Sequence, residues 1–592
     1  MEPQEILKIS SLRTAFKVDK TWNQVVQGLD FSLNKGKTLG IVGESGSGKS
    51  ITSLSIMGLL PAGGRILDGE IFFKSAQQGQ VNLLNLKGEE MRRIRGKEIA
   101  MIFQEPMSSL NPVIKCGKQI VEALRLHLNM SREEARYKTL DLFRQVELPR
   151  IEDMFESYPH QLSGGQLQRV MIAMAISCEP KVLIADEPTT ALDVTVQKSI
   201  LSLLEDLQAK NQMSIIFITH DLGVVAEIAD DVLVMKGGKK MEYGSVGQIF
   251  EDPQSPYTKG LLACRPQMDQ LMRRLPTLEE YEAGDFDPAT YASTKEAFYQ
   301  RQEALKEAEP LLKVKGLRKF YAKGANSWFS KSREEIRAVD EVNFEVFPGE
   351  TLGLVGESGC GKTTLGRTVL KLLEPTAGKI LYNGKEIQDL PEKELRPLRK
   401  EIQIIFQDPY SSLNPRIPIG RAIQEPMKVH GIGSNDVDRK ERVMQLLEKV
   451  GLSREHYNRY PHAFSGGQRQ RICIARTLAV SPKFVICDES VSALDVSIQA
   501  QVLNLLKDLQ EEMGLTYIFI SHDLSVVKFM SDRILVMKGG KIVEADDAEK
   551  LYSNPQTEYT RQLIAAVPQG SMESLKAAIQ RREVKREKMA SN

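Results

Sequence analysis

The sequence predicts an α/β fold that occurs twice along one chain of 592 residues. Three observations predict it: a set of motifs recurs in the same order, each copy joins a short apolar strand to a glycine-rich turn and a helix, and the composition is globular. Apolar residues make up 41% and charged residues 27%, which excludes a disordered or fibrous chain. A chain of this length is also too long for one compact core.

Charge and cysteine usage narrow the function classes. Lys plus Arg number 79 and Asp plus Glu number 78, so there is no broad electrostatic reason to expect a nucleic-acid partner. The six cysteines include no CxxC pair, which predicts reduced thiols rather than a zinc site or a disulfide framework. No apolar run approaches the length that crosses a bilayer, and the acidic N-terminus is not followed by the apolar region of a secretory signal.

Self-similarity divides the chain into two copies. GIVGESGSGKS at 40–50 recurs as GLVGESGCGKT at 353–363, and YPHQLSGGQLQRV recurs as YPHAFSGGQRQRI. From Ser163 and Ser465 onward, the equivalent motifs are 302 residues apart by subtraction of their positions. Because the spacing between motifs is kept, the copies are two complete domains and not repeats of a solenoid.

The motifs also set the expected domain boundaries. We expect a first domain at 1–265, a linker with partial helix at 266–308, a second domain at 309–568 and a basic tail at 569–592. The tail has the pattern of a solvated basic helix, since charge runs are usually solvated. Attraction to an anionic membrane surface is the alternative function of that pattern.

Each copy carries the pattern GxxxxGK[ST]. In each copy it directly follows an apolar strand, which is expected at 38–42 in the first copy and at 351–355 in the second. Glycines let successive backbone N–H groups point at phosphate oxygens, the following helix adds its positive end, and the Lys reaches the β- and γ-phosphates. The hydroxyl after the Lys is placed to ligate Mg²⁺. The predicted nucleotide-binding residues are Gly43, Ser45, Gly46, Gly48, Lys49, Ser50 and Ile51, and in the second copy Gly356, Ser358, Gly359, Gly361, Lys362, Thr363 and Thr364.

Two apolar strands, VLIADE and FVICDE, each end in a pair of carboxylates. Asp186 and Asp488 are predicted to hold Mg²⁺, directly or through water. Glu187 and Glu489 follow on opposite-pointing positions and are free to take a proton from water. A strand that ends in DE is more often structural, but its position after the phosphate-binding loop favours a catalytic role.

Polar residues follow two further strands of each copy. His220 and His522 occupy equivalent positions, which favours a catalytic role in orienting the γ-phosphate and the attacking water over the commoner structural role. Gln104 and Gln407 end strands in the same way and are predicted to bind nucleotide and to touch Mg²⁺ or water. The predicted metal ligands are therefore Ser50, Gln104 and Asp186, and in the second copy Thr363, Gln407 and Asp488.

LSGGQ and FSGGQ each precede an amphipathic helix pattern. The Ser caps the helix and two glycines leave N–H groups bare at its positive end, which predicts a second anion site in each domain. The residues are Ser163, Gly164, Gly165 and Gln166, and in the second copy Ser465, Gly466, Gly467 and Gln468. Phe16 and Tyr321 are candidates for adenine stacking, with ordinary edge-strand aromatics as the open alternative.

Taken in order, these motifs resemble those of the ATP-binding-cassette family over nearly the whole chain, including Ala191-Leu-Asp after the carboxylate strand. SSLNP after each Gln and YPH before each SGGQ are similar to the importer subfamily for di- and oligopeptides, nickel and glutathione. The resemblance implies two tandem P-loop ABC nucleotide-binding domains, each with a mixed-sheet ATPase core and a helical subdomain at about 105–160 and 408–462. It also implies ATP and Mg²⁺ as cofactors.

The resemblance further implies partners and a location. Two integral-membrane permease subunits and, indirectly, a solute-binding protein are expected, with the chain peripheral to the cytoplasmic face of the inner membrane. We expect the halves to pair within the chain, so that each ATP lies between one P-loop and the opposite SGGQ, with both sites hydrolytic. The alternative is a soluble two-cassette translation factor that acts on ribosomes, although those tend to end the signature in Glu. A zinc-containing DNA-repair ATPase is disfavoured by the lack of CxxC pairs.

Overall fold

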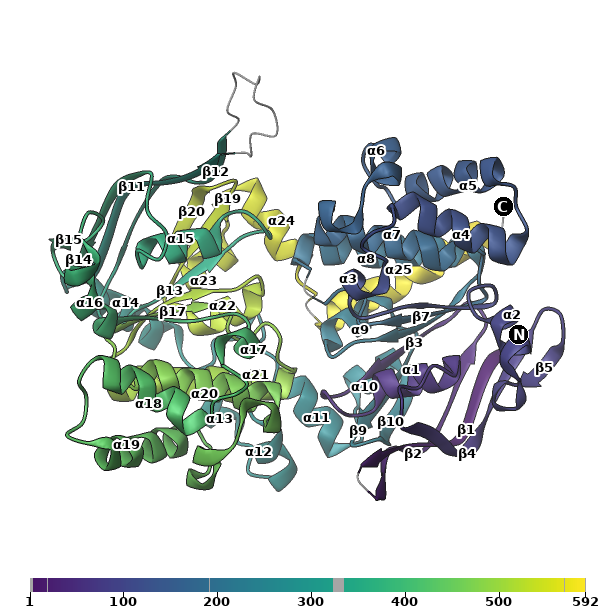
Figure 1. Cartoon of the computed structure of the whole chain (residues 1–592), viewed down its shortest axis with the longest axis horizontal. Helices are drawn as coiled ribbons and strands as arrows, with labels where there is room; N and C mark the ends of the chain where they lie inside the picture. The colour runs from purple at the N-terminus through teal and green to yellow at the C-terminus, as the bar shows by residue number, and fades with distance from the viewer. Residues whose placement is uncertain (1–3, 19, 191, 323–334, 569, 591–592) are drawn as a thin grey trace. The chain divides into compact units, whose positions relative to one another are not determined.

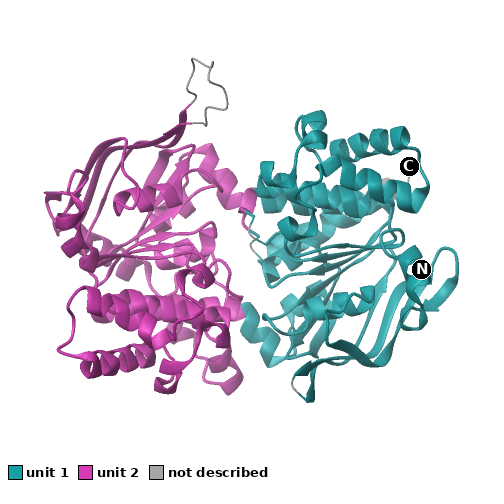
Figure 2. Cartoon of the chain, viewed as in Figure 1, with its two compact units in different colours: residues 1–192, 196–262, 568–592 teal, residues 193–195, 263–567 magenta. Residues whose placement is uncertain are grey.

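The computed structural model describes the chain except residues 1–3, 19, 191, 323–334, 569 and 591–592. Ala191, noted above, therefore lies outside the described residues. The chain divides into two compact units, which Figure 2 colours separately. Unit 1 comprises residues 1–192, 196–262 and 568–592, and unit 2 comprises residues 193–195 and 263–567. Apart from residues 193–195, each unit holds one copy of the duplicated motifs, and the predicted tandem α/β fold is confirmed.

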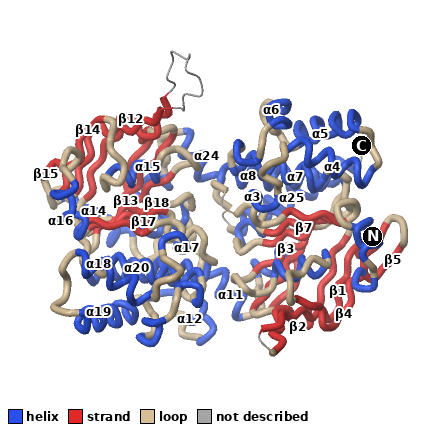
Figure 3. Tube along the Cα trace, viewed as in Figure 1, coloured by secondary structure: helices blue, strands red, loops and turns tan. Residues whose placement is uncertain are grey.

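A six-stranded mixed sheet forms the centre of unit 1, in the order β10-β9-β3-β8-β7-β6 (Figures 1 and 3). Strands β6, β7, β8, β3 and β9 pair in parallel, and β10 is an antiparallel edge. Strands β3, β7 and β8 are buried throughout, as expected where both faces of a parallel sheet are covered. The strands are β3 (Thr38–Val42), β6 (Ile99–Ile102), β7 (Val182–Asp186), β8 (Ser214–Ile218), β9 (Asp231–Lys236) and β10 (Lys239–Ser245).

A second, antiparallel sheet of unit 1 has the order β2-β1-β4-β5. Strand β1 alternates between buried and exposed residues over parts of its length, and its register shifts at bulges near Leu12. This alternation fits a sheet that packs one face on a core. The strands are β1 (Glu5–Val18), β2 (Thr21–Asn34), β4 (Gly64–Ser75) and β5 (Gly79–Asn82).

A helical subdomain of unit 1 follows β6, where the resemblance placed it. Its helices share one apolar core with the six-stranded sheet, with Phe143 and Phe155 among its buried members. Gly117 is required there, because a Cβ on it would lie 2.1 Å from the ring of Phe155. The helices of this subdomain are α3 (Pro106–Ser109), α4 (Cys116–Leu128), α5 (Arg132–Gln145), α6 (Ile151–Glu156) and α7 (Gly164–Ile176). The other helices of the unit are α1 (Lys49–Met57), α2 (Gly88–Ile94), α8 (Val194–Asn211), α9 (Leu222–Ile228), α10 (Val246–Glu251), α11 (Pro256–Ala263) and α25 (Met572–Ala590).

Unit 2 repeats this architecture. Its mixed sheet has the order β16-β17-β18-β13-β19-β20, and its antiparallel sheet has the order β12-β11-β14-β15. The strands are β11 (Leu312–Ala322), β12 (Glu335–Val346), β13 (Thr351–Val355), β14 (Ala377–Tyr382), β15 (Lys385–Glu386), β16 (Ile402–Ile405), β17 (Phe484–Asp488), β18 (Thr516–Ile520), β19 (Arg533–Lys538) and β20 (Lys541–Asp547). The helices are α12 (Leu278–Ala283), α13 (Pro288–Tyr291), α14 (Lys295–Lys306), α15 (Lys362–Val369), α16 (Glu392–Glu401), α17 (Pro409–Ser412), α18 (Ile419–Val429), α19 (Asp436–Lys449), α20 (Gly466–Leu478), α21 (Val496–Met513), α22 (Leu524–Met530), α23 (Ala548–Ser553) and α24 (Glu558–Ala566).

The segments between and after the two copies do not stand apart from the units. Residues 263–308 pack as part of unit 2, and the tail from 568 packs as part of unit 1. The expectation of a solvated tail is wrong for one face of α25, since Arg582 is 3% exposed and Leu575 and Ala578 are buried. Its basic residues face carboxylates and carbonyls of unit 1, which is why a charge run folds against the protein. Among the described residues, no helix has both the length and the apolar character that a membrane span needs.

Candidate ATP-hydrolysis sites

The phosphate-binding loop of unit 1 lies between the end of β3 and the start of α1. Gly43 and Gly48 have φ of 149° and 95°, and a Cβ on Gly43 would lie 2.1 Å from the carbonyl oxygen of Met235. Only glycine fits these positions. Lys49 Nζ donates to the carbonyl oxygens of Gly43 and Glu44 at 2.7 and 2.9 Å, so its ammonium lies over its own loop.

Unit 2 builds the same loop between β13 and α15. Gly356 and Gly361 have φ of 152° and 111°. Lys362 Nζ donates to the carbonyl oxygens of Gly356 and Glu357 at 2.7 and 3.0 Å. The two units therefore present loops of the same form.

Two of the three predicted metal ligands meet in each unit. Ser50 Oγ donates to Asp186 Oδ1 at 3.0 Å, and Thr363 Oγ1 donates to Asp488 Oδ1 at 2.9 Å. Burial is the main cause that raises the pKa of Asp186, to about 6, and it raises the pKa of Asp488 as well. A hydroxyl and a buried carboxylate side by side are hard oxygen ligands, so these residues fit Mg²⁺.

Glu187 is the centre of a polar cluster at the end of β7. His220 Nδ1 lies 3.4 Å from Glu187 Oε1, and Gln104 Nε2 and Thr190 Oγ1 donate to Glu187 Oε2 at 3.1 and 2.9 Å. Burial opposes the charged form of Glu187, but the hydrogen bond and charge of His220 outweigh it and hold the pKa of Glu187 below its usual value. A carboxylate that stays ionised can accept a proton from water.

The equivalent cluster in unit 2 surrounds Glu489. Gln407 Nε2 donates to Glu489 Oε2 at 2.7 Å, and His522 Nδ1 lies 3.5 Å from the same oxygen. Burial opposes ionisation here too, and His522 lowers the pKa of Glu489 below its usual value. Each Gln therefore contacts the catalytic candidate rather than the Ser–Asp or Thr–Asp pair predicted to hold the metal.

The two clusters differ in two contacts that sequence reasoning missed. Ser492, at the position of Thr190, donates its hydroxyl to the backbone oxygen of Glu489 instead of its side chain. Arg367 lies 3.8 Å from Asp488, whereas Leu54 holds the equivalent position in unit 1. The Arg–Leu difference five residues after the loop lysine was the signal available in the sequence.

A tyrosine supports each phosphate-binding loop and was also missed. Tyr257 OH accepts the backbone N–H of Glu44 at 3.4 Å, and Tyr559 OH accepts that of Glu357 at 3.2 Å. Both tyrosines are buried. Their recurrence 302 residues apart, in SPYTKGLLA and TEYTRQLIA, was the signal that could have identified them.

The SGGQ segments form capped helix starts. In α7 the Ser163 hydroxyl accepts the N–H of Gln166 at 3.3 Å, and Gln166 accepts the N–H of Ser163 at 3.0 Å. Ser465 and Gln468 form the same reciprocal pair at the start of α20. Ser163 and Ser465 are both exposed, so the predicted helix caps are accessible from solvent.

The aromatic candidates lie on the antiparallel sheets, not on the mixed sheets that hold the loops. Phe16 is half-buried on β1. Its ring packs against Gly64, where an added Cβ would lie 2.7 Å from the ring. Tyr321 is 37% exposed near the end of β11, with Lys319 Nζ 5.1 Å from the ring centroid. Adenine stacking by either ring stays a prediction.

A P-loop joined to a carboxylate strand, a His and a capped SGGQ helix defines an ABC-type ATPase, and comparison agrees. The ABC transporter family model matches residues 26–190 and 339–492. The model for the oligopeptide/dipeptide transporter C-terminal region matches residues 241–301 and 543–591. The chain belongs to the ABC transporter family, and it is an ATP-hydrolysing subunit of the importer type.

Two relatives match this chain over nearly its whole length. The chain is 50% identical over 575 residues to the glutathione import ATP-binding protein GsiA of Salmonella paratyphi A, which covers 96% of this chain and 90% of that relative. It is 49% identical over 576 residues to the protein of the same name from Escherichia coli K12, with the same shares covered. These relatives do not support the translation-factor alternative.

Proposed function

We propose that this chain hydrolyses two ATP molecules per cycle to drive uptake of glutathione or a related short peptide. The observation that carries the two-site part is the complete cluster in both units, with Glu187 beside His220 and Glu489 beside His522. The solute class rests on the relatives named for glutathione import and on the peptide-transporter region that follows each cassette.

In each unit the residues divide the work of hydrolysis. Lys49 would move its ammonium from the loop carbonyls to the β- and γ-phosphates of incoming ATP. Ser50 and Asp186 would hold Mg²⁺, which neutralises charge on the phosphates when bound. Glu187 would take the proton of the attacking water at its carboxylate while His220 keeps that carboxylate in place, and ADP and phosphate would leave.

Each ATP would also contact the SGGQ helix of the other half. The support is chemical: Ser163 and Ser465 are exposed and each starts a helix whose first N–H groups lack intrahelical partners. Such an end attracts a terminal phosphate. ATP binding would close the halves, and product release would reopen them.

The proposal includes partners that this chain needs. Two integral-membrane permeases would hold the chain at the cytoplasmic face of the inner membrane, with α3–α6 and the equivalent helices of unit 2 passing on the movement. A solute-binding protein would deliver cargo to the permeases. The cassettes themselves would not touch the solute.

The test is ATP hydrolysis by the chain reconstituted with its permeases in vesicles and supplied with its solute-binding protein. Glutathione or a short peptide should raise the hydrolysis rate above that with unloaded binding protein, and labelled solute should accumulate inside. The Glu187→Gln, Glu489→Gln double variant should bind ATP without either effect. Stimulation by neither glutathione nor any di- or oligopeptide would refute the solute class, while leaving the ATPase assignment intact.

A further inference from the structure

An aspartate at the same position of each unit marks the base of the phosphate-loop strand. Asp230 Oδ2 accepts the backbone N–H of Thr38 at 2.8 Å, and Asp532 Oδ2 accepts that of Thr351 at 2.8 Å. Thr38 and Thr351 are the first residues of β3 and β13, whose other ends lead into the phosphate loops. The aspartates lie 302 residues apart, the spacing of the other duplicated motifs.

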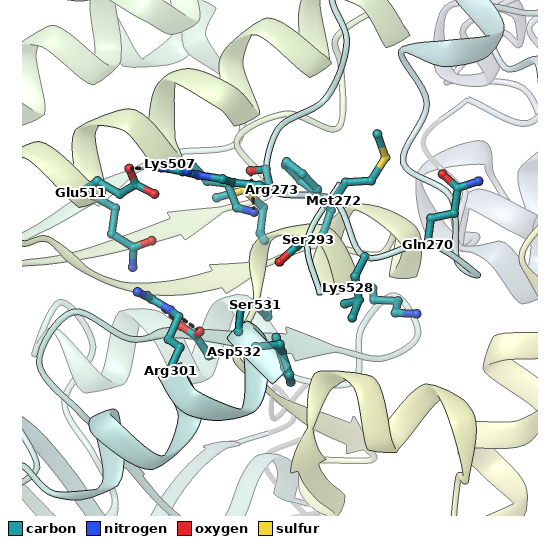
Figure 4. A pocket seen from close by; sticks show the side chains of 16 residues that line it. Gln270, Met272, Arg273, Ser293, Arg301, Lys507, Glu511, Lys528, Ser531 and Asp532 are labelled. Carbon is teal, nitrogen blue, oxygen red and sulfur yellow. Dashed lines mark hydrogen bonds and ion pairs between the residues drawn. The ribbon is translucent and has the colours of Figure 1, made fainter. Parts of the chain in front are cut away.

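Each aspartate is gripped by an arginine with two hydrogen bonds. Arg586 of α25 donates to both oxygens of Asp230 at 2.7 Å. Arg301 of α14 donates to both oxygens of Asp532, at 2.7 and 3.3 Å, and Figure 4 shows it pointing at that carboxylate at the edge of a cavity of about 240 Å³. Paired N–H donors on a carboxylate give both strength and geometric specificity.

Each arginine belongs to a segment that follows one copy in the chain but packs on the unit formed by the other copy. Arg301 follows the first copy yet docks on unit 2, and Arg586 follows the second copy yet docks on unit 1. Each peptide-transporter C-terminal region, at 241–301 and 543–591, therefore begins on one unit and ends on the other. The position that lies 302 residues before Arg586 is Gly284, so the two arginines do not occupy equivalent positions of the repeat.

Neighbouring contacts make each docking site specific. In unit 1, Arg582 donates to the carbonyl of Ala229 at 2.8 Å, and Glu205, which is 4% exposed, receives Arg581 and Lys585. In unit 2, Gln302 donates to the carbonyl of Asp532 at 2.7 Å. Also in unit 2, Leu275 and Asn504 exchange two hydrogen bonds, and Arg274 pairs with Asp508. Because Glu205 and Asp532 are buried carboxylates, losing these cations would leave buried negative charge without its ion-pair partner.

We propose that the two extensions are exchanged docking arms: each binds the aspartate at the base of the other half's phosphate-loop strand and keeps the halves associated when no nucleotide is bound. The arms attach at the end of the strand opposite the phosphate loop, so they leave the hydrolysis sites free to open. This inference does not rest on the proposed solute.

The test uses the full chain with a protease recognition sequence inserted between Asp269 and Gln270, two exposed residues of the linker. Cleavage separates residues 1–269 from 270–592, and the fragments are then joined by α25, which packs on unit 1, and by the short segment 263–269, which packs on unit 2. Without nucleotide and with a metal chelator, the cleaved fragments should still elute together in gel filtration. With Arg582→Ala and Arg586→Ala they should separate, with at least a tenfold weaker association.

Arg301→Ala is the matched control. It removes the equivalent ion pair, but Arg301 and Asp532 both lie in the second fragment, so the cleaved fragments should remain together. Circular dichroism and the uncleaved proteins report whether the variants fold. Separation of the cleaved wild-type protein, or continued association of the Arg582→Ala, Arg586→Ala protein, would each overturn the proposal.

Discussion

Glu187 and Glu489 both have φ of 48°, in the left-handed region that glutamate rarely adopts. Such a backbone conformation costs about 1–3 kcal/mol and persists only where surrounding contacts hold it. Here the N–H of each residue donates to the end of the neighbouring strand, at Ile218 and Ile520, at 2.9 Å. The strain places the carboxylate beside the His and Gln that orient it, away from the preceding Asp.

Replacing the glutamate tests this arrangement. Glu187→Gln and Glu489→Gln should each lower steady-state phosphate release strongly, and the double variant by about 10²–10⁴-fold, because a positioned base is lost. Binding of a fluorescent ATP analogue should persist, since the loop residues are unchanged. Glu179→Gln, at an exposed position away from both clusters, is the control. Near-full hydrolysis by Glu187→Gln would contradict the two-site assignment.

Much of the arrangement of these side chains was predictable from the sequence, because short motifs place their residues at known positions on strands and loops. A buried strand that ends in Asp-Glu, a glycine-rich loop and a His after a strand meet at one edge of a parallel sheet. The Gln contacts were predicted less well, because chain order could not distinguish the metal-ligand pair from Glu187. Tyr257 was missed since its contact joins residues 213 positions apart.

At the scale of the element, the SGGQ helices depend on two glycines for different reasons. In α20 a Cβ on Gly467 would lie 2.2 Å from Ile498 Cγ2 on α21, whereas one on Gly466 would find its nearest neighbour at 4.0 Å. In α7 the equivalent distances are 2.9 Å for Gly165 and 3.8 Å for Gly164. The second glycine is therefore needed for helix packing, and the first remains open toward solvent or ligand.

This difference predicts that alanine at the second glycine destabilises the protein more than alanine at the first. Gly467→Ala should lower the free energy of unfolding by about 1–3 kcal/mol, the usual result of forcing an extra carbon into a packed contact. Gly466→Ala should change it by less than about 1 kcal/mol, and helix propensity favours the alanine. Urea unfolding followed by circular dichroism compares the two. Equal destabilisation by both alanines would show that the packing contact with Ile498 is not the cause.

The whole molecule departs most from what the sequence predicts at its linker and tail. The strands and helices of each copy were predictable because their apolar patterns report burial within one domain. The charge run in α25 gives no sign of burial. Its arginines at 581, 582 and 586 have the pattern of a solvated face, and only the structure shows that Glu205 and Asp230 lie beside them. Those partners lie more than 350 positions earlier, and no periodicity points to them.

Loss of the tail should affect one unit only. A chain that ends at Val567 lacks α25, so Glu205 loses Arg581 and Lys585, and Asp230 loses Arg586, while unit 2 keeps its own arm. Calorimetry should show a lower unfolding temperature for unit 1, with a ligand-free transition for unit 2 within about 2 °C of wild type. A downward shift of the unit 2 transition as large as that of unit 1 would contradict the assignment of α25 to unit 1.

The stabilisation that the arm on unit 1 provides should also depend on pH. Burial raises the pKa of Asp230, but Arg586, the Thr38 N–H and the charge of Lys37 outweigh burial and lower it below the usual 3.8. The nearby Arg582 of α25 and Asp231 of β9 complete its charged surroundings. Since the folded pKa is below the unfolded one, the stabilisation is present above about pH 4 and is lost as the pH falls through the folded value.

Arg586→Ala measures this contribution. At pH 7 the free energy of unfolding of the variant should be about 1–3 kcal/mol lower than that of wild type, as expected for the loss of hydrogen bonds to a charged group. The gap should narrow below pH 4, because protonated Asp230 gains little from the arginine. Denaturant titrations from pH 7 to pH 3 check this, with Lys576→Ala on the exposed face of α25 as control. A gap that stays constant down to pH 3 would exclude the Arg586–Asp230 pair as its source.

The position of α25 has a consequence for biosynthesis. Its nineteen residues are translated after the whole of unit 2, yet they complete the packing of the unit made first. Domains usually fold as units in the order of translation. Here unit 1 receives the arginines that pair with Glu205 and Asp230 only after unit 2 has been translated, so a nascent chain stalled within unit 2 would expose an incompletely packed unit 1 to chaperones and proteases.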